Sequence, residues 1–362
     1  MKRRFFAAML ALSLSLTGCA SLLAREYSSV TTHNAAPTAE DDPSILRAES
    51  YQELVNALLY FVTNGAETGM IRLYLASDLV GPSLENACLE VVQEDPLGAY
   101  AVDFIKFSVN SVVTYSEAEV HITYRRSQEQ IDSIIPATGI TAIRSELVSA
   151  MESCDPECVL RVSYFNGDED SIRTLARQAY LQNPTSILDY PDSTISIYPD
   201  SGRQRIVEIK LTYHEEASTL TQQREDLNRQ LHAMSLHLSA AHNAEDPLAV
   251  ADTVLTAVKY DEKGDTTAFD ALASGSADSE GLALTYAALC EILNLPCRVI
   301  EGSKQDVPYF WNLVETDSGW RHIDLPALAE QDQIPLVDQE MMDLSYLWDT
   351  SFYPQSGPKP EE

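Results

Sequence analysis

The feature that most constrains the fold of this chain is a unit that occurs twice in its first half. The letters ELVNAL at 53–58 return as ELVSAM at 146–151, and each opens a helical apolar pattern. Ser50 lies three residues before Glu53, which predicts a capping box at the start of the first helix. Short apolar segments at 70–73 and 159–162 follow, so a helix and then a strand are expected in both copies.

Each copy also ends in a strand of alternating polarity. The apolar face of that strand comprises Val120, Ile122 and Tyr124 in the first copy, and Ile209, Leu211 and Tyr213 in the second. His121 and His214 stand on the polar faces and are interpreted as solvated residues. The order helix, strand, helix, strand, strand over residues 45–215 predicts two small repeated α/β modules, each with an antiparallel sheet covered on one side.

Charge excludes one class of function. The 362 residues contain 55 Asp and Glu against 24 Lys and Arg, a net charge of -31, so a phosphate backbone would be repelled. We therefore expect no nucleic-acid partner. The hydrophobic content of 45% is sufficient for two or three packed domains.

The N-terminus has the layout of an export signal. Basic residues at 2–4 precede an apolar run at 5–16, and this run is too short to span a bilayer. The sequence Leu-Thr-Gly-Cys at 16–19 resembles the bacterial lipobox, which implies cleavage after residue 18 and diacylglyceryl modification of Cys19. Residues 1–18 are then the lipoprotein signal peptide and 19–44 a flexible tether. We expect an extracytoplasmic protein, lipid-anchored to a bacterial membrane through Cys19.

Five cysteines remain after Cys19, and an odd number forbids complete pairing within one chain. Cys154 and Cys158 flank a turn, so a local disulfide between them is compatible with an exported protein. Neither has a histidine-rich neighbourhood, and no metal site or cofactor is predicted. Cys88, Cys290 and Cys297 are expected to be small core residues.

The second half, 216–362, begins with a linker helix over 216–243 and continues with helices before strands. Asp246 and Pro247 predict one helix start, and a second helix is expected from Ser279 to Asn294, with a loop up to Gly275 between them. Three strands follow, over 297–301, 309–315 and 320–324. Helices followed by an antiparallel meander predict an α+β domain.

This domain contains a series of short motifs, in order along the chain: Gly275, Glu280-Gly281, 293–302 (LNLPCRVIEG), Trp311-Asn312, Gly319-Trp320, His322-Ile323-Asp324, Tyr346, Trp348 and 352–354 (FYP). The series resembles the transglutaminase-like superfamily of bacterial proteins, which share a papain-like core. The resemblance covers about residues 245–354 and does not reach the first half.

The resemblance implies a site in which a Cys at a helix N-terminus, a His on a strand and an Asp on the next strand act together. The matching positions here are Ser279, Tyr309 and Asp324. Tyrosine does not accept a proton at neutral pH as imidazole does, and a serine hydroxyl without a base is a weak nucleophile. The pattern therefore favours a catalytically inactive pseudoenzyme whose groove binds a peptide, a peptidoglycan-type ligand or a partner protein.

One catalytic alternative stays open at this point. His322 and Asp324 are two residues apart on one strand, so their side chains share a face. A Ser279, His322 and Asp324 arrangement would make the protein a serine-dependent hydrolase or acyltransferase. The competing interpretations are a structural His322 and a Ser279 that only caps its helix.

Overall fold

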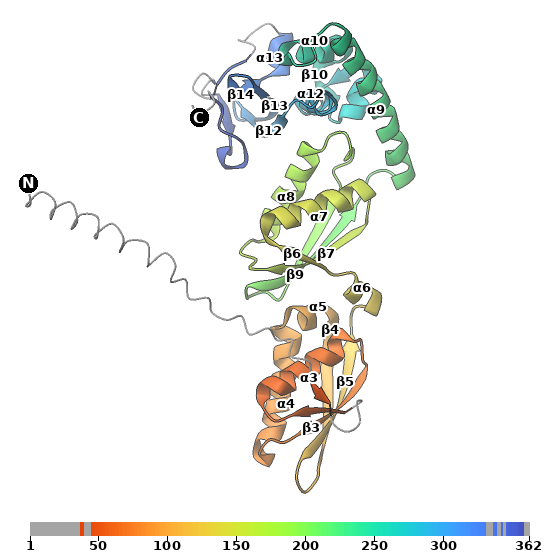
Figure 1. Ribbon diagram of the computed structural model, residues 1–362, viewed down its shortest axis with the longest axis vertical. Coiled ribbons are helices and arrows are strands. Elements are labelled where there is room, and N and C mark those ends of the chain that lie inside the picture. The colour runs from red at the N-terminus through yellow and green to blue at the C-terminus, as the bar shows by residue number, and fades with distance from the viewer. Residues whose placement is uncertain (1–36, 40–44, 331–335, 339–341, 343–344, 358–362) are drawn as a thin grey trace, which may run out of the picture. The chain divides into compact units, whose positions relative to one another are not determined.

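The computed structural model describes residues 37–39, 45–330, 336–338, 342 and 345–357. The predicted signal peptide, Cys19 and most of the tether lie outside these residues. The chain divides into two compact units (Figure 1). One unit comprises the chain up to residue 91 together with 104–123, and the other comprises 92–103 together with 124–362.

The first unit is built on a sheet of order β1-β2-β3-β5-β4. Its elements, in chain order, are β1 (Thr38–Ala39), β2 (Ile45–Ala48), α3 (Tyr51–Thr63), β3 (Thr68–Leu73), α4 (Ser77–Gln93), β4 (Val102–Ser111) and β5 (Ser116–Tyr124). The predicted cap of α3 is present, because the Ser50 side chain accepts a hydrogen bond from the Glu53 N–H. The Glu53 carboxylate bonds the N–H of Glu49 instead of that of Ser50, so the capping box is displaced by one residue.

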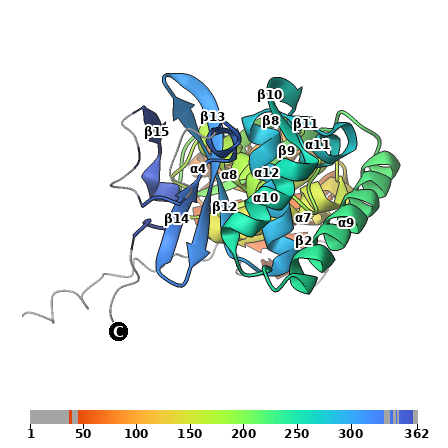
Figure 2. The ribbon, with the colours of Figure 1, turned by 90° about the horizontal axis from the view of Figure 1, so that it is seen from above.

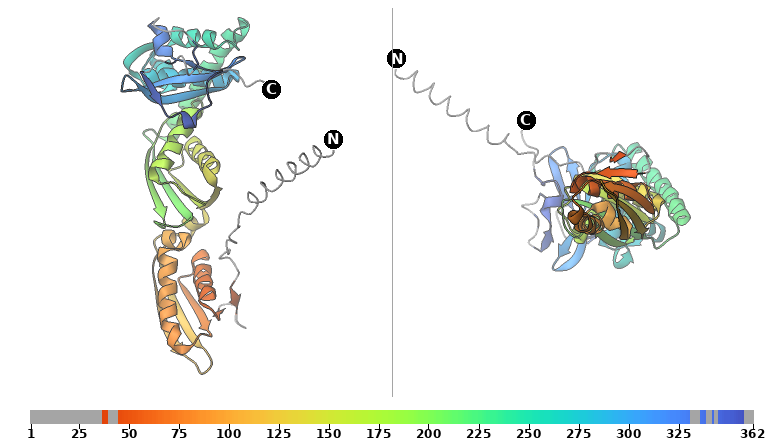
Figure 3. Two further views of the ribbon diagram at one scale, coloured as in Figure 1. Left: turned by 90° about the vertical axis from the view of Figure 1, so that its left-hand side faces the viewer. Right: turned by 90° about the horizontal axis from the view of Figure 1, so that it is seen from below.

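The second unit begins with a similar module on a sheet of order β6-β7-β9-β8. Its elements are α5 (Pro96–Ala101), α6 (Gln128–Asp132), β6 (Ile135–Thr138), α7 (Gly139–Ser153), β7 (Glu157–Ser163), α8 (Glu169–Gln182), β8 (Asp192–Tyr198) and β9 (Gln204–Thr212). Helices α7 and α8 pack together beside the sheet (Figure 3). Their buried side chains share one core with the strand residues Leu160, Val207 and Ile209.

The expectation of purely antiparallel sheets is wrong, because β2 pairs with β3 and β6 pairs with β7 in parallel. A helix connects the two strands of each pair, and a strand reached through a helix returns in the same direction. The first strand of each pair has only four residues. That length is too short to show alternation, so the sequence pattern missed both strands.

The rest of the second unit carries helices on one side of a meander. Its elements are α9 (Ala217–Ala240), α10 (Pro247–Ala257), β10 (Lys259–Asp265), α11 (Ala268–Ser274), β11 (Ser276–Ala277), α12 (Ser279–Leu293), β12 (Cys297–Lys304), β13 (Val307–Thr316), β14 (Gly319–Ile323), α13 (Leu325–Ala329), β15 (Tyr346–Trp348) and the 3-10 turn η2 (Thr350–Phe352). Figure 2 shows α9, α10 and α12 beside the antiparallel sheet β14-β13-β12-β15. The predicted meander is confirmed, and the mixed architecture is α+β.

The segment expected to be a loop before Gly275 contains β10 and α11. β10 has few apolar residues and no buried one, so it lacks the alternation of a half-buried strand. α11 has only seven residues; Thr267 caps its start, and Gly275 ends it in the left-handed conformation. A helix of this length spans too few turns for its apolar periodicity to stand out.

Two further findings concern the cysteines and the membrane. Cys154 and Cys158 are free thiols, so the disulfide that the sequence allows is not formed in this structure. Cys158 points into the module core, whereas Cys154 ends α7 in the left-handed conformation. Among the described residues, no helix combines the length and apolar character that crossing a membrane requires.

Candidate functional site

The N-terminus of α12 places Ser279 at the edge of the meander sheet. Asp278, and not Ser279, is the cap, because its carboxylate accepts a hydrogen bond from the Gly281 N–H at 2.9 Å. Ser279 is the first residue of the helix and is 8% exposed. Its hydroxyl oxygen accepts a hydrogen bond from the backbone N–H of Phe310 at 3.3 Å. The prediction that Ser279 caps the helix is therefore wrong, since its side chain turns toward β13.

Strand β13 divides its side chains between two environments. The Asn312 amide nitrogen donates to the Ala283 carbonyl of α12 at 2.9 Å, so the even-numbered residues of the strand face the helix. Tyr309 and Trp311 belong to a separate cluster on the opposite face, with Ile300, Leu313 and Tyr346. The site is therefore built where α12 meets one edge of the sheet and the aromatic cluster begins.

Asp324 is the centre of a buried polar network in this cluster. One carboxylate oxygen accepts hydrogen bonds from the Tyr309 hydroxyl at 2.9 Å and from the Ala327 N–H at 3.0 Å. The other accepts from the Tyr346 hydroxyl at 2.5 Å and from the Lys304 ammonium at 3.2 Å. With four donors, this 8% exposed carboxylate has the partners that a buried anion requires.

Tyr309 donates its hydroxyl proton to Asp324 and is held in the neutral form. Burial, followed by the charge and hydrogen bond of Asp324, raises its pKa far above the ordinary value for tyrosine. The Lys304 ammonium lies 4.9 Å from the ring centroids of both Tyr309 and Tyr346. Lys304 thus fills the space beside the two rings with a cation that neutralises Asp324.

His322 lies in the aromatic cluster but is not bonded to Asp324. The Trp311 indole N–H donates to His322 Nδ1 at 3.1 Å, and because indole only donates, the ring proton of His322 must be on Nε2. His322 is 3% exposed, and burial lowers its pKa to about 4. At neutral pH it is a neutral ring that packs against Trp311 and Trp348.

The structure brings some of the predicted site residues together. Tyr309 and Asp324 are in direct contact, and Ser279 is bonded to the residue after Tyr309. His322 has its Nδ1 turned to Trp311, so the alternative arrangement of Ser279, His322 and Asp324 has no hydrogen bond that links its members among the described contacts. Sequence reasoning missed Lys304. Lys304 ends β12, whereas Asp324 follows β14, and β13 lies between these two strands in the sheet. No local sequence pattern indicates that the two side chains meet.

Helix α8 of the neighbouring module approaches the same site. The Arg177 guanidinium donates to Glu280, the residue after Ser279, at 2.9 Å and to Glu301 of β12 at 3.2 Å. Beside this network is a cavity of about 440 Å³, which is bounded by α8, β12 and the C-terminal segment. Its lining includes Arg173, Arg177, Tyr190, Glu301, Asp349, Phe352 and Tyr353.

No group of three or more His, Cys, Asp or Glu residues is placed to hold a metal ion within the described part of the chain. The hydrogen bonds to Asp324 also favour a structural role for this carboxylate over metal binding. Each oxygen of Asp324 already accepts from protein donors, two of them on tyrosine rings.

Comparison with known proteins gives the class of the C-terminal domain. Residues 233–325 match the sequence model of the transglutaminase-like superfamily, so this domain is transglutaminase-like. The match covers α10 to β14, including Ser279, Tyr309 and Asp324.

Two solved structures are similar at low identity. One is the crystal structure of a TGase, which is 14% identical, covers 61% of this chain and 66% of that chain, and has a TM-score of 0.25. The other is a putative cysteine protease from Cytophaga hutchinsonii, 16% identical over 41% of this chain and 67% of that chain, with a TM-score of 0.23. At these scores neither adds to the family match. No significant match is found among curated proteins.

Proposed function

We propose that this protein is an exported, lipid-anchored and non-catalytic binding protein, whose transglutaminase-like domain has become a pseudoenzyme. One observation carries the proposal: Asp324 holds the hydroxyl of Tyr309 at the position where the resemblance requires a histidine. In an active site of this kind the carboxylate orients an imidazole, but here Asp324 accepts a hydrogen bond from Tyr309, which keeps its proton at neutral pH.

The loss of a base explains why catalysis is not expected. Ser279 needs a proton acceptor to become a nucleophile, and Tyr309 is a donor whose pKa is raised. His322, the alternative base, uses Nδ1 to accept from Trp311 and lies in a buried aromatic environment. These contacts favour the pseudoenzyme over a serine-dependent hydrolase or acyltransferase.

The ligand that we propose is a peptide, either free, linked to glycan as in the bacterial cell envelope, or part of a partner protein. The cavity of about 440 Å³ supports this proposal, because it combines charges of both signs with aromatic side chains. Peptide main chains and side chains offer matching donors, acceptors and apolar groups. The net charge of -31 supports the absence of a nucleic-acid partner.

We also propose that the two α/β modules are repeats. Both have the strand order in which a parallel pair is followed by an antiparallel partner, β2-β3-β5 and β6-β7-β9. In both, a helix lies between the two parallel strands along the chain. The flexible tether at 19–44 would lift the folded part off the membrane.

The catalytic part of the proposal is tested with amide hydrolysis and amine transfer by the purified protein, using Ser279→Ala as the control. We expect the same background rate for both proteins. Turnover that disappears in Ser279→Ala would overthrow the pseudoenzyme. The double variant Ser279→Cys with Tyr309→His tests the assignment of the two positions, since Tyr309 belongs to the face of β13 opposite α12. Thiol reactivity above that of Ser279→Cys alone would show that an imidazole at 309 reaches residue 279.

The binding part is tested by calorimetric titration with cell-envelope peptides and peptidoglycan fragments. Phe352, 48% exposed, lines the cavity, whereas Leu347, 59% exposed, belongs to the same C-terminal segment and does not line it. We expect Phe352→Ala to weaken binding by about tenfold, the loss of one large apolar contact, and Leu347→Ala to leave it unchanged. Equal affinities for the two variants would remove the cavity from the proposal.

A further inference from the structure

We infer that helix α8 of the second module is a built-in cover over the entrance to Ser279, held in place by Arg177. Ser279 is then closed off within the chain itself and becomes accessible only when α8 moves, whereas the ligand cavity proposed above is present with α8 in place. This inference rests on the proposed function for its purpose. The access of a dissolved reagent to residue 279, which the test below measures, does not depend on any ligand.

Arg177 contacts two residues that are joined to Ser279, one by the chain and one by a hydrogen bond. Its Nη2 donates at 2.9 Å to Glu280, the residue after Ser279 in α12. Its Nε donates to both carboxylate oxygens of Glu301 at 3.2 Å. The same guanidinium lies 5.4 Å from the ring of Phe310, whose backbone N–H bonds the Ser279 hydroxyl. Arg177 therefore contacts both the residue after Ser279 and the residue that fixes its side chain.

The environment of Arg177 makes this contact strong. The side chains of Arg177 and Glu280 are 20% and 15% exposed, and the rings of Tyr180 and Tyr190 lie 5.4 and 5.1 Å from the guanidinium. A planar guanidinium that stacks on aromatic rings and bonds two carboxylates is little screened by water. Removal of Arg177 would leave Glu280 as a buried charge without this partner, which is costly.

A second contact holds α8 against the same strand. The Gln182 side chain, at the end of α8, donates to the Val299 carbonyl of β12 at 3.3 Å. The apolar core of the module is also continuous with that of the C-terminal domain, since both contribute to one cluster of buried residues. Helix α8 is thus attached along its length and not at one side chain alone.

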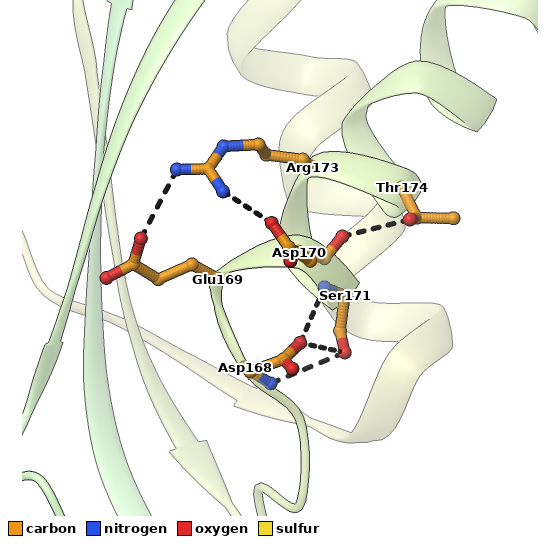
Figure 4. Close-up of polar contacts among 6 residues, drawn as sticks. All are labelled: Asp168, Glu169, Asp170, Ser171, Arg173 and Thr174. Carbon is orange, nitrogen blue, oxygen red and sulfur yellow. Dashed lines mark hydrogen bonds and ion pairs between the residues drawn. The ribbon is translucent and has the colours of Figure 1, made fainter.

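Arg173 provides a matched comparison on the same helix, one turn before Arg177. Figure 4 shows that its guanidinium bonds Glu169 and Asp170, both in the first turn of α8. Arg173 is 44% exposed, and its two ion-pair partners are also exposed. Its ion pairs stay within α8, so they contribute little to holding the helix on the C-terminal domain.

The test uses Ser279→Cys as a reporter of access. A thiol at a helix N-terminus is reactive, and peptide-resolved mass spectrometry measures its modification by iodoacetamide separately from the native cysteines. In this background we compare Arg177→Met with Arg229→Met, a control in α9 whose ion pair to Asp226 stays within that helix and which does not line the cavity. We expect labelling at residue 279 to be about tenfold faster in Arg177→Met and unchanged in Arg229→Met, because only the first removes the ion pairs that hold α8 beside residue 279.

Cys290 gives an internal check for unfolding, since it is 0% exposed and should stay unlabelled in a folded variant. If Arg177→Met labels Cys290, the variant has unfolded, and Glu301→Gln decides instead. It removes one of the two carboxylate partners and should raise labelling at 279 by about threefold.

Equal labelling rates in the parent, Arg177→Met and Glu301→Gln proteins would overturn the cover. Failure of the proposed function would be seen differently, as turnover that depends on Ser279 or as the absence of peptide binding.

Discussion

At the scale of single residues, the chemistry of the site is decided by what bonds to each polar group. Asp324 has four protein donors, Ser279 accepts from a backbone N–H, and His322 accepts from Trp311. These partners are hydrogen-bond donors, so none of them takes a proton from the Ser279 hydroxyl. The site therefore has the hydrogen-bond pattern of a structural core, although Ser279 and Asp324 stand at positions that the family resemblance assigns to catalysis.

His322 should make the protein less stable as the pH falls. Its pKa is about 4 in the folded state and near 6.5 when exposed, so between these values the unfolded chain binds a proton that the folded chain does not. The contribution of the neutral His322 ring to the free energy of unfolding is fully present above pH 6.5. It declines by about 3 kcal/mol as the pH falls to about 4. Urea unfolding of the protein and of His322→Gln measures this, because glutamine can still accept from Trp311.

The wild-type protein should lose stability relative to His322→Gln over this pH range, and the difference should stay constant below it. Carboxylates that titrate over the same range are common to both proteins and cancel in the comparison. Parallel curves for the two proteins between pH 7 and pH 4 would contradict a buried neutral imidazole.

At the scale of elements, the N-terminus of α12 depends on a close approach to its neighbours. A Cβ atom on Gly281 would lie 2.2 Å from the Asp265 carbonyl oxygen and 2.9 Å from the Ala277 Cβ. The first of these atoms belongs to the backbone of β10 and cannot move independently. Glycine is therefore required where α12 packs on β10 and β11, and this packing positions Ser279.

Gly281→Ala should destabilise the second unit by about 3 kcal/mol, because the clash forces the helix away from β10. The matched control is Gly81→Ala in α4, where a Cβ meets no atom within 4 Å outside the adjoining residues and the backbone of its own helix. That change should alter the stability by less than about 1 kcal/mol, because the better helix propensity of alanine is offset by the steric restriction on the residue before Pro82. Hydrogen exchange resolved by peptide measures α12 and α4 separately. Unchanged protection of α12 in Gly281→Ala would contradict the close approach.

At the scale of the whole molecule, the proposed function requires that the chain be held at a membrane from outside the cytoplasm. The proposal assigns this attachment to the lipidated Cys19. Two acyl chains on Cys19 are sufficient for a stable anchor.

Cys19→Ser should abolish incorporation of labelled fatty acid and move the protein from the membrane fraction to the soluble fraction. Cys88→Ser is the control, because that thiol is buried at 7% exposure and should have no part in anchoring. Retention of Cys19→Ser in the membrane fraction after a high-salt wash would contradict the lipid anchor.

The amino-acid sequence by itself determined the features that depend on local pattern. The alternation in 120–124 and 209–213 predicted two strands with one buried face, and the meander from β12 to β14 followed from its strand and turn residues. The series of motifs around Ser279, Tyr309 and Asp324 identified the domain that the family match supports. These signals lie within short segments, where side-chain period and turn chemistry are readable.

Only the tertiary structure decided the parallel pairing of the four-residue strands, the four donors around Asp324 and the approach of Arg177 to Glu280. The partners in these cases are far apart in the chain; Arg177 and Glu280, for example, are separated by 103 residues. Such contacts form because packing brings distant surfaces together, and no local periodicity encodes which side chains then meet. For the same reason, a site that the sequence locates correctly can have a chemistry that only its surroundings define.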